Sequence, residues 1–339
     1  MDDAGVSEED ELKLFAGGHH ARFIDESTPM HLISKTFQSR FLLVPCAELN
    51  NLIAGVVGRA QIVYPAVSLH AIVFMSNHLH AIATGPANEL PAFMGFIKRE
   101  ISRRWGGRPD VDWRGGMWSG LVATALPTPE SQVNALRYVL SQGVKEDLVE
   151  RPELWPGVQS VRALVDGDEM KGDWLDATRY QRALQLEARK QEPANVDRAD
   201  FFETYVIALS PLPAWAALEE IERRKLVREL VEEISAEATR RRAETGATVV
   251  GAERVMAMSR ENRTQSPPPP WFEWRRRMIA WADARAAGTR DFVRRYWQFQ
   301  DAFRRASRLF LSGELTVEFP LRAFRPVTWR SHVMAVATT

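Results

Sequence analysis

Two histidines that stand two residues apart in a short apolar run are the side chains of this sequence best suited to chemistry. They are His78 and His80, within residues 74–83. In a β-strand, residues i and i+2 point to the same face and lie about 7 Å apart. Two neutral imidazoles at that spacing can share one divalent ion. The pattern therefore predicts a metal site, although two strand histidines without a ligand role give the same undemanding spacing.

A tyrosine and a glutamine further along the chain complete the candidate site. Tyr138 and Gln142 fall in a predicted helix, where residues i and i+4 share one face. A phenol, with a pKa of about 10, is a poor nucleophile at neutral pH, but a metal-bound phosphate is a better electrophile. Gln142 can offer its carbonyl oxygen as a third, hard ligand. These residues predict a metal-assisted tyrosine nucleophile; the alternative is that Tyr138 is a half-buried packing residue.

The overall composition is that of a folded protein. Its 339 residues, 45% hydrophobic and 26% charged, are enough for two domains with packed cores. The formal net charge is zero, which argues against a uniformly basic surface and leaves local basic patches open. The single cysteine, Cys46, suits a reducing cytoplasm. Because the sequence has neither the pattern of a signal peptide nor an apolar run of about 18 residues, we expect a cytoplasmic protein without membrane spans.

The elements that position the candidate site follow a β-α-β-β-α-β order and then a further helix. A strand or hairpin is predicted at residues 31–44, strands at 66–74, 77–84 and 118–126, and helices at 45–60, 89–105 and 129–148. Ser76 and Asn77 form the tight turn between the second and third strands. This order is the split βαβ pattern, so the sequence predicts an α+β, ferredoxin-like domain with an antiparallel sheet and helices.

The chain is predicted to divide into four parts. These are an acidic tail over residues 1–28, the α+β domain over 29–165, a connector with short helices over 166–212, and a mostly α-helical C-terminal domain, rich in Arg and Trp, over 213–339. Helices are predicted in the last part at residues 214–245 and 292–311, with a stiff four-proline break at 267–270 between them.

One basic cluster lies at the end of the helix predicted over residues 89–105. Lys98, Arg99, Arg103 and Arg104 could hold a phosphate backbone, or could form a solvated face that suits a helix C-terminus. Trp118, which follows a Gly- and Arg-rich stretch, could stack on a base if exposed or pack in the core if buried. We take these residues as candidate DNA contacts.

A second basic region covers residues 271–330, where 13 arginines stand against 6 acidic residues with aromatic residues between them. This pattern suits nucleic acid, and amphipathic helices give a similar one. We expect the region to add salt-dependent DNA affinity without taking part in the chemistry. In the competing picture its aromatic rings are buried and its arginines pair with Asp283, Asp291 and Asp301.

These motifs together resemble the single-tyrosine HUH transposases, especially the REP-associated tyrosine transposases. Residues 75–80, Met-Ser-Asn-His-Leu-His, are similar to the Met-Pro-Asn-His-hydrophobic-His of that family. Residues 93–98 resemble its helix with Phe-Met and Lys, and residues 138–145 resemble its catalytic-tyrosine helix. Residues 148–156 resemble the segment that closes its domain, and the whole similarity spans about residues 29–165.

The resemblance implies an enzyme that cleaves and rejoins single-stranded DNA. Tyr138 would attack a phosphodiester, form a 5′-phosphotyrosine link and free a 3′-OH, while His78, His80 and Gln142 hold Mg²⁺ or Mn²⁺. No other cofactor is implied. The resemblance further implies a hairpin-bearing DNA substrate and a homodimer.

The chain departs from the family in three places. Gln142-Gly143 stands where many REP-associated members have Asn-Pro, Ser76 replaces a proline, and residues 170–339 have no counterpart. Gln142 is closer to the insertion-sequence transposases, in which a glutamine at that place binds the metal. Two other functions stay open: a domesticated DNA-binding protein that no longer cleaves, and a replication initiator or relaxase with the same chemistry.

Overall fold

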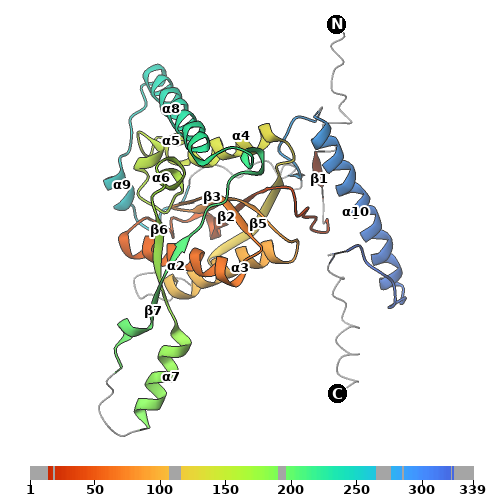
Figure 1. Ribbon diagram of the computed structural model, residues 1–339, viewed down its shortest axis with the longest axis horizontal. Coiled ribbons are helices and arrows are strands. Elements are labelled where there is room, and N and C mark those ends of the chain that lie inside the picture. The colour runs from red at the N-terminus through yellow and green to blue at the C-terminus, as the bar shows by residue number, and fades with distance from the viewer. Residues whose placement is uncertain are drawn as a thin grey trace.

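The computed structural model of the chain describes residues 14–17, 20–106, 116–189, 196–264, 276–284, 286–321 and 323 (Figure 1). The strands are β1 (Phe15–Gly17), β2 (Met30–Thr36), β3 (Ser68–Met75), β4 (His78–Thr84), β5 (Trp118–Ala125), β6 (Met170–Leu175), β7 (Phe202–Ile207) and β8 (Arg276–Met278). The α-helices are α2 (Ala47–Val63), α3 (Glu89–Trp105), α4 (Pro129–Leu140), α5 (Gln142–Lys145), α6 (Val161–Val165), α7 (Ala177–Ala188), α8 (Glu220–Thr245), α9 (Ala252–Met256) and α10 (Ala287–Leu311).

An antiparallel four-stranded sheet with the order β3-β4-β2-β5 lies at the centre of the molecule. β2 pairs with β4 on one side and with β5 on the other, and β3 and β4 form a hairpin. The second and fourth strands of the predicted series therefore lie at the two edges, which is the arrangement of a split βαβ unit. The predicted α+β, ferredoxin-like fold is confirmed, and long helices follow it in the C-terminal half.

Both faces of this sheet are covered, by different parts of the chain. One face packs on α2 and α3, with Leu79 and Phe93 in that layer of the core. The other face packs on α4 and α8, with Val73, Ile82 and Leu136 in the second layer. Figure 1 shows α2 and α3 below the sheet and α4 and α8 above it. Because strand residues alternate, the residues on either side of Leu79 face α4.

The first strand and the last helix of the predicted domain are shorter in the structure than the sequence predicts. β2 ends at Thr36 instead of Val44, because a 3-10 turn follows in which Gln38 takes a positive φ of 55°. The helix predicted over residues 129–148 ends at Leu140, and a separate short helix begins at Gln142. The helix predicted over residues 89–105 has those bounds in the structure.

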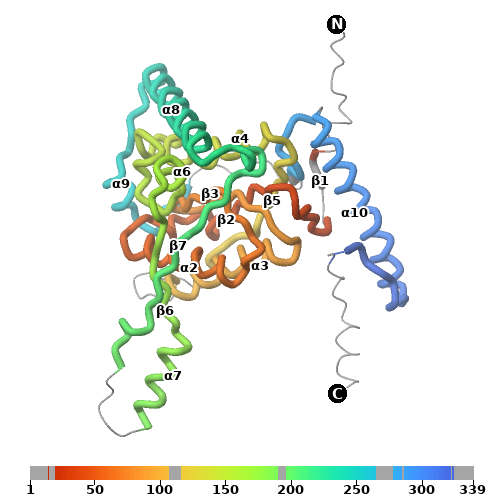
Figure 2. The backbone as a smooth tube through the Cα atoms, viewed as in Figure 1, coloured from red at the N-terminus to blue at the C-terminus, as the bar shows by residue number. Residues whose placement is uncertain are grey.

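The predicted connector, residues 166–212, is folded against the first helix of the domain. The sequence predicts its short helix α7 but not β6 and β7, which pair as a two-stranded antiparallel sheet and pack on α2. Two glycines permit the close approach: a Cβ on Gly55 would lie 2.3 Å from the carbonyl oxygen of Asp173, and one on Gly172 would lie 2.2 Å from that of Asn51. α7 extends away from the rest of the protein at the end of this hairpin (Figure 2).

The C-terminal half contacts the first domain at two places. α8 begins at Glu220, later than predicted, and buries Val227, Val231 and Ile234 in the layer that it shares with α4. α10 begins at Ala287, earlier than predicted, and lies at the other end of the molecule (Figure 1). Within the described part of the chain, no helix combines the length and apolar composition that crossing a membrane requires.

The described part of the segment predicted as an acidic tail contains a strand and buried side chains. β1 pairs with β8, and Ile24 is buried. The ring of Phe23 contacts the ring of Phe292 at a centroid distance of 5.5 Å and that of Tyr296 at 5.9 Å. Apolar contacts to α10 order this segment, and the charge pattern of the sequence does not reveal them.

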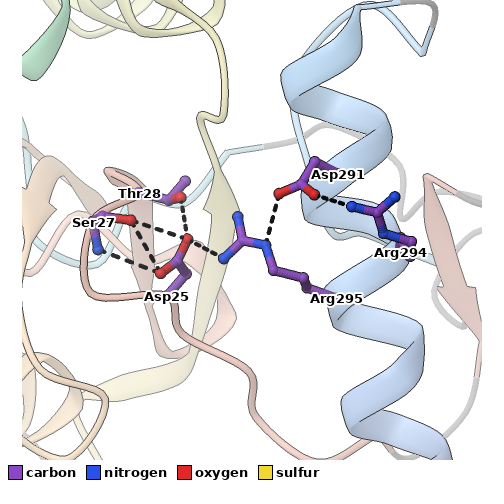
Figure 3. Close-up of polar contacts among 6 residues, drawn as sticks. All are labelled: Asp25, Ser27, Thr28, Asp291, Arg294 and Arg295. Carbon is purple, nitrogen blue, oxygen red and sulfur yellow. Dashed lines mark hydrogen bonds and ion pairs between the residues drawn. The ribbon is translucent and has the colours of Figure 1, made fainter.

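Ion pairs also tie the N-terminal segment to α10 (Figure 3). Arg295 donates from Nη1 to Asp25 at 2.7 Å and from Nε to Asp291 at 2.9 Å, and Arg294 pairs with Asp291 as well. The hydroxyl of Thr28 donates to Asp25 at 2.7 Å. Burial raises the pKa of the Asp25 carboxyl, but the hydrogen bonds from Thr28 and Arg295 and the charge of Arg295 outweigh it, so the pKa lies below 3.8.

Asp25→Asn is expected to lower the free energy of unfolding at pH 7 by about 1.5–3 kcal/mol, the typical contribution of a hydrogen bond to a charged group. The folded-state pKa of Asp25 lies below its unfolded value of about 3.9. The stabilisation is therefore complete above that value and is lost as the pH falls through the folded pKa. Urea unfolding at pH 7 and pH 3 measures both effects. Asp301→Asn, which removes an exposed pair within α10 with Arg304, is the control; an equal loss in the two variants would contradict the expectation.

Candidate active site

β4 brings two histidines to the sheet face that α4 covers. The turn at Ser76 and Asn77 leads directly into the strand, because Met75 pairs with His78. Strand alternation buries Leu79 in the opposite layer, so His78 and His80 both lie on the α4 side. Their ring centroids are 4.8 Å apart.

α4 places a tyrosine over these histidines, and α5, which follows it directly, begins with the glutamine. The helix begins at a capping box formed by Thr128 and Ser131, and Leu136 and Val139 bury its inner face. Tyr138 lies near the end of the helix, and its ring centroid is 5.5 Å from that of His80.

The Gln142 amide, one turn after Tyr138, has a fixed orientation. Its Nε2 donates to the carbonyl oxygen of Tyr138 at 2.9 Å, which leaves Oε1 3.4 Å from Nε2 of His78. The structure therefore brings Tyr138, His78, His80 and Gln142 together between β4 and α4.

The hydrogen bonds around His78 leave its Nε2 unprotonated. Asn77 donates from Nδ2 to the carbonyl oxygen of Ser39 and to the hydroxyl of Thr264, so its Oδ1 faces His78. Nδ1 of His78 lies 2.6 Å from that oxygen and must donate to it, because a carbonyl oxygen only accepts. Nε2 of His78 and Oε1 of Gln142 are then two acceptors that face each other, an arrangement that a cation between them would stabilise.

A third histidine supports His80. Nε2 of His31, on β2, lies 2.9 Å from Nδ1 of His80, and the two rings stack with their centroids 5.1 Å apart. If Nδ1 of His80 donates in this bond, its Nε2 carries a free lone pair, as it must in a metal ligand. His31 then orients His80 as Asn77 orients His78.

Burial keeps all three imidazoles neutral. It lowers the pKa of His31 to about 4 and that of His78 to about 4. Burial also lowers the pKa of His80 to about 2, with the charges of His78 and His31 adding to the effect. Lys35 and Lys145 depress the pKa values of His78 and His80 further. Neutral imidazoles are the form that binds metal, and the lysines make the surroundings favourable for a phosphate.

The donor set fits a divalent ion. Two ligands that bind one ion at about 2.1 Å in adjacent octahedral positions lie about 3 Å apart, close to the 3.4 Å between His78 and Gln142. Among the described residues, no three His, Cys, Asp or Glu side chains are grouped as a metal site would need. An ion here would therefore depend on Gln142 as well as on His78 and His80.

Tyr138 lies at the rim of this cluster. It is half-buried, and Trp281 contacts it edge-on with a centroid distance of 5.3 Å. Nζ of Lys145 lies 4.9 Å from the centre of the tyrosine ring. Tyr138 is therefore partly exposed beside the ammonium group of Lys145, and the charges of Lys35 and Lys145 act on the neighbouring histidines.

The structure does not bring the predicted DNA-binding residues to this cluster, because α3 covers the opposite face of the sheet. Lys98 donates to the carbonyl oxygen of Ser119 at 2.8 Å, and the indole N–H of Trp118 donates to the carbonyl oxygen of Lys98 at 3.0 Å. The buried carboxylate of Glu100 pairs with three of these residues, Arg99, Arg103 and Arg104. Arg99 and Arg103 keep 62% and 60% of their side-chain surface exposed, so their binding of DNA stays a prediction.

Sequence reasoning missed four residues of the site. They are His31, Lys35, Lys145 and Trp281. The sequence does contain a hint of the role of His31: a histidine near the start of a predicted strand can point to the same face of the sheet as a His-x-His pair on a neighbouring strand. Its partner, however, depends on the register, in which His31 pairs with Ile82 and lies diagonal to His80. Trp281 has no local signal, because it reaches the site from the C-terminal half.

His31→Phe is expected to weaken Mn²⁺ binding by about 10- to 100-fold, the usual cost of losing a residue that orients a metal ligand. Phenylalanine keeps a ring against His80 and removes the acceptor for its Nδ1–H. Isothermal titration calorimetry without DNA measures the affinity. His70→Phe is the control, because His70 is also buried on a strand but bonds to Thr84 and Ser210. An unchanged affinity in folded His31→Phe would show that His31 does not support the site.

Comparisons with known proteins give one structural similarity. No protein-family model matches the sequence, and no curated protein matches it at a significant level. The chain is similar to a solved structure of a REP-associated tyrosine transposase bound to a REP hairpin, at 14% sequence identity. The match covers 53% of this chain and 91% of that chain, with a TM-score of 0.36. Because this TM-score is low, the chemistry of the site is inferred from the residues of this chain.

Proposed function

We propose that this protein is a metal-dependent tyrosine transposase that cleaves and rejoins single-stranded DNA. One observation carries the proposal: two acceptors, Nε2 of His78 and Oε1 of Gln142, face each other at 3.4 Å one helical turn from Tyr138. Neutral, oriented ligands next to an accessible phenol are the parts that a metal-assisted tyrosine nucleophile needs.

In the proposed reaction Tyr138 supplies the nucleophile. Its phenolic oxygen forms a bond to the phosphorus of a DNA phosphodiester and loses its proton. The bond from phosphorus to the 3′ oxygen breaks, and that oxygen takes up a proton to become a 3′-OH. The product is a 5′-phosphotyrosine link. Attack by a 3′-OH reverses the step, so one phosphoester bond replaces another and no nucleotide cofactor is needed.

His78, His80 and Gln142 would hold Mg²⁺ or Mn²⁺. When bound, such an ion draws charge from the phosphoryl oxygens and so makes phosphorus a better electrophile. Asn77 and His31 hold the two imidazoles in the orientation and tautomer that this role requires. The charges of Lys35 and Lys145 attract the phosphate.

The substrate that we propose is hairpin-bearing single-stranded DNA, and the proposed assembly is a homodimer. Both proposals rest on the similarity of residues 75–80 and 138–145 to the motifs of REP-associated tyrosine transposases. A domesticated DNA-binding protein that does not cleave is the main alternative, and it predicts binding without a covalent product.

The test is to incubate the purified full-length protein with 3′-labelled, hairpin-bearing single-stranded DNA and Mn²⁺. The proposal expects a labelled protein band that survives denaturing electrophoresis and does not form when EDTA is present from the start of the reaction. Rejoining is expected when an oligonucleotide with a free 3′-OH is added to the adduct. Binding without any covalent adduct would favour the non-cleaving alternative, and absence of both would contradict the assignment to DNA.

A further inference from the structure

A cleft lies between α8 and the neighbouring helices α4 and α5, beside the place where these helices pack together, and Tyr138 lines it. Its volume is about 250 Å³, just below the range of about 300–1,000 Å³ that small-molecule sites have. Tyr138 and Lys145 line it from the first domain, and Glu237 and Arg241 line it from α8. Trp281 also lines it, so the two halves of the chain build this cleft jointly.

The cleft carries an excess of positive charge. Its charged lining residues are Arg137, Lys145 and Arg241 against Glu237. Glu237 pairs with Arg137, and Asp147 pairs with Arg241. Nη1 of Arg137 is nevertheless buried without a hydrogen-bond partner. The Lys145 side chain is exposed, and its ammonium group lies over the ring of Tyr138. A phosphate in the cleft would therefore meet cations on the side where the nucleophile lies.

An aromatic ring completes the cleft. The backbone N–H of Trp281 donates to the carbonyl oxygen of Ala125, the last residue of β5, at 2.8 Å. The sheet therefore fixes the position of Trp281, although the residue comes from the C-terminal half. Its ring is half-buried and stands nearly perpendicular to that of Tyr138, at 84°. A half-exposed indole offers a stacking surface to a base.

We propose that this cleft binds the nucleotide next to the phosphate that Tyr138 attacks. α8 and Trp281 thereby complete the substrate site, and the C-terminal half is part of the nuclease and not an accessory DNA-binding module. This inference rests on the proposed function. A single-stranded nucleotide fits the combination of net positive charge, an aromatic face and a volume near that of a small-molecule site.

Other cationic parts of the described C-terminal half are less suited to this role. On α10, Arg294 and Arg295 pair with Asp291, and Arg304 pairs with Asp301. These pairs agree with the alternative that the arginines of residues 271–330 pair with aspartates and do not bind DNA. In addition, α10 lies at the far end of the molecule from α8 (Figure 1). Trp271 and Trp274 lie outside the described residues. At the cleft, in contrast, charge from both halves of the chain meets at Tyr138.

The test compares two charge changes of opposite sign in the cleft. Lys145→Gln removes a cation, and Glu237→Gln removes the lining acid and frees Arg137. Glu229→Gln is the matched control, because Glu229 is also exposed on α8 and does not line the cleft. All three changes are made in the full chain carrying Tyr138→Phe, which separates binding from cleavage. Fluorescence anisotropy with a labelled hairpin-bearing DNA strand in EDTA excludes effects through a metal.

Lys145→Gln is expected to weaken binding and to reduce the slope of log affinity against log salt by about 0.7, the loss of one phosphate contact on a single strand. Glu237→Gln is expected to tighten binding beyond any change in Glu229→Gln. If the wild type forms the covalent adduct but both cleft variants bind as Glu229→Gln does, the cleft proposal is overturned and the proposed function stands. If neither binding nor an adduct is seen, both fail.

Discussion

A protein with Tyr138→Phe is expected to form no covalent adduct with single-stranded DNA under conditions in which the wild type forms one. Phenylalanine keeps the ring that contacts His80 and Trp281 and removes only the oxygen that we propose as the nucleophile. Among the described residues, no hydrogen bond from the Tyr138 hydroxyl needs to be replaced. The free energy of unfolding should therefore stay within about 0.5 kcal/mol of the wild-type value.

The matched control for this experiment is Tyr64→Phe. Tyr64 packs against Phe93 and Phe96 in the core layer on the opposite side of the sheet. This variant loses the same hydroxyl group far from the histidines and should form the adduct at the wild-type rate. Denaturing electrophoresis of labelled DNA measures both variants. A normal adduct in Tyr138→Phe would exclude Tyr138 as the nucleophile.

Loss of a proposed metal ligand is the second change with a large expected effect. His78→Ala should weaken Mn²⁺ binding by more than about 100-fold, because losing a residue that only supports a ligand already costs about 10- to 100-fold. Isothermal titration calorimetry of the DNA-free protein measures this directly. The readout does not depend on catalysis, so it tests the ligands even if the correct DNA substrate has not been found.

Substitutions at Gln142 give a graded version of the same test. Gln142→Leu removes the oxygen that faces His78, whereas Gln142→Glu keeps an oxygen there and adds a charge. Because oxygen ligands and their charge set the affinity for hard cations, the expected order of Mn²⁺ affinity is Glu, then Gln, then Leu. Gln132→Leu is the control, since Gln132 is a buried amide on α4, the helix before Gln142, and bonds to Leu126 and Ala214. Equal affinities for all three residues at position 142 would rule out a ligand there.

The sheet has a core layer on each face, and a truncation near residue 165 would expose one of them. The predicted boundary near residue 165 would separate α8 from the face that it covers. α8 buries Val227, Val231 and Ile234 in that layer, and fully burying such a side chain contributes roughly 1.5–3 kcal/mol. The 339-residue chain, without truncation, is therefore the appropriate protein for every test above.

The sequence by itself determined the local parts of the candidate site. A strand period of two places His78 and His80 on one face, and a helix period places Gln142 one turn after Tyr138. The turn at Ser76 and Asn77 and the bounds of α3 also followed from local patterns. Each of these features depends on residues close together in the chain, where side-chain spacing and turn chemistry decide the backbone path.

Only the tertiary structure decided which of these parts meet. The contact of His78 with Gln142 joins residues 64 apart, and that of His31 with His80 joins residues 49 apart. Such contacts depend on strand register and on which face each helix covers, and neither is encoded in a local period. The same reason explains two contacts that the sequence did not predict. The arginines of α3, predicted to contact DNA, surround the buried carboxylate of Glu100. The ring of Trp281 contacts that of Tyr138.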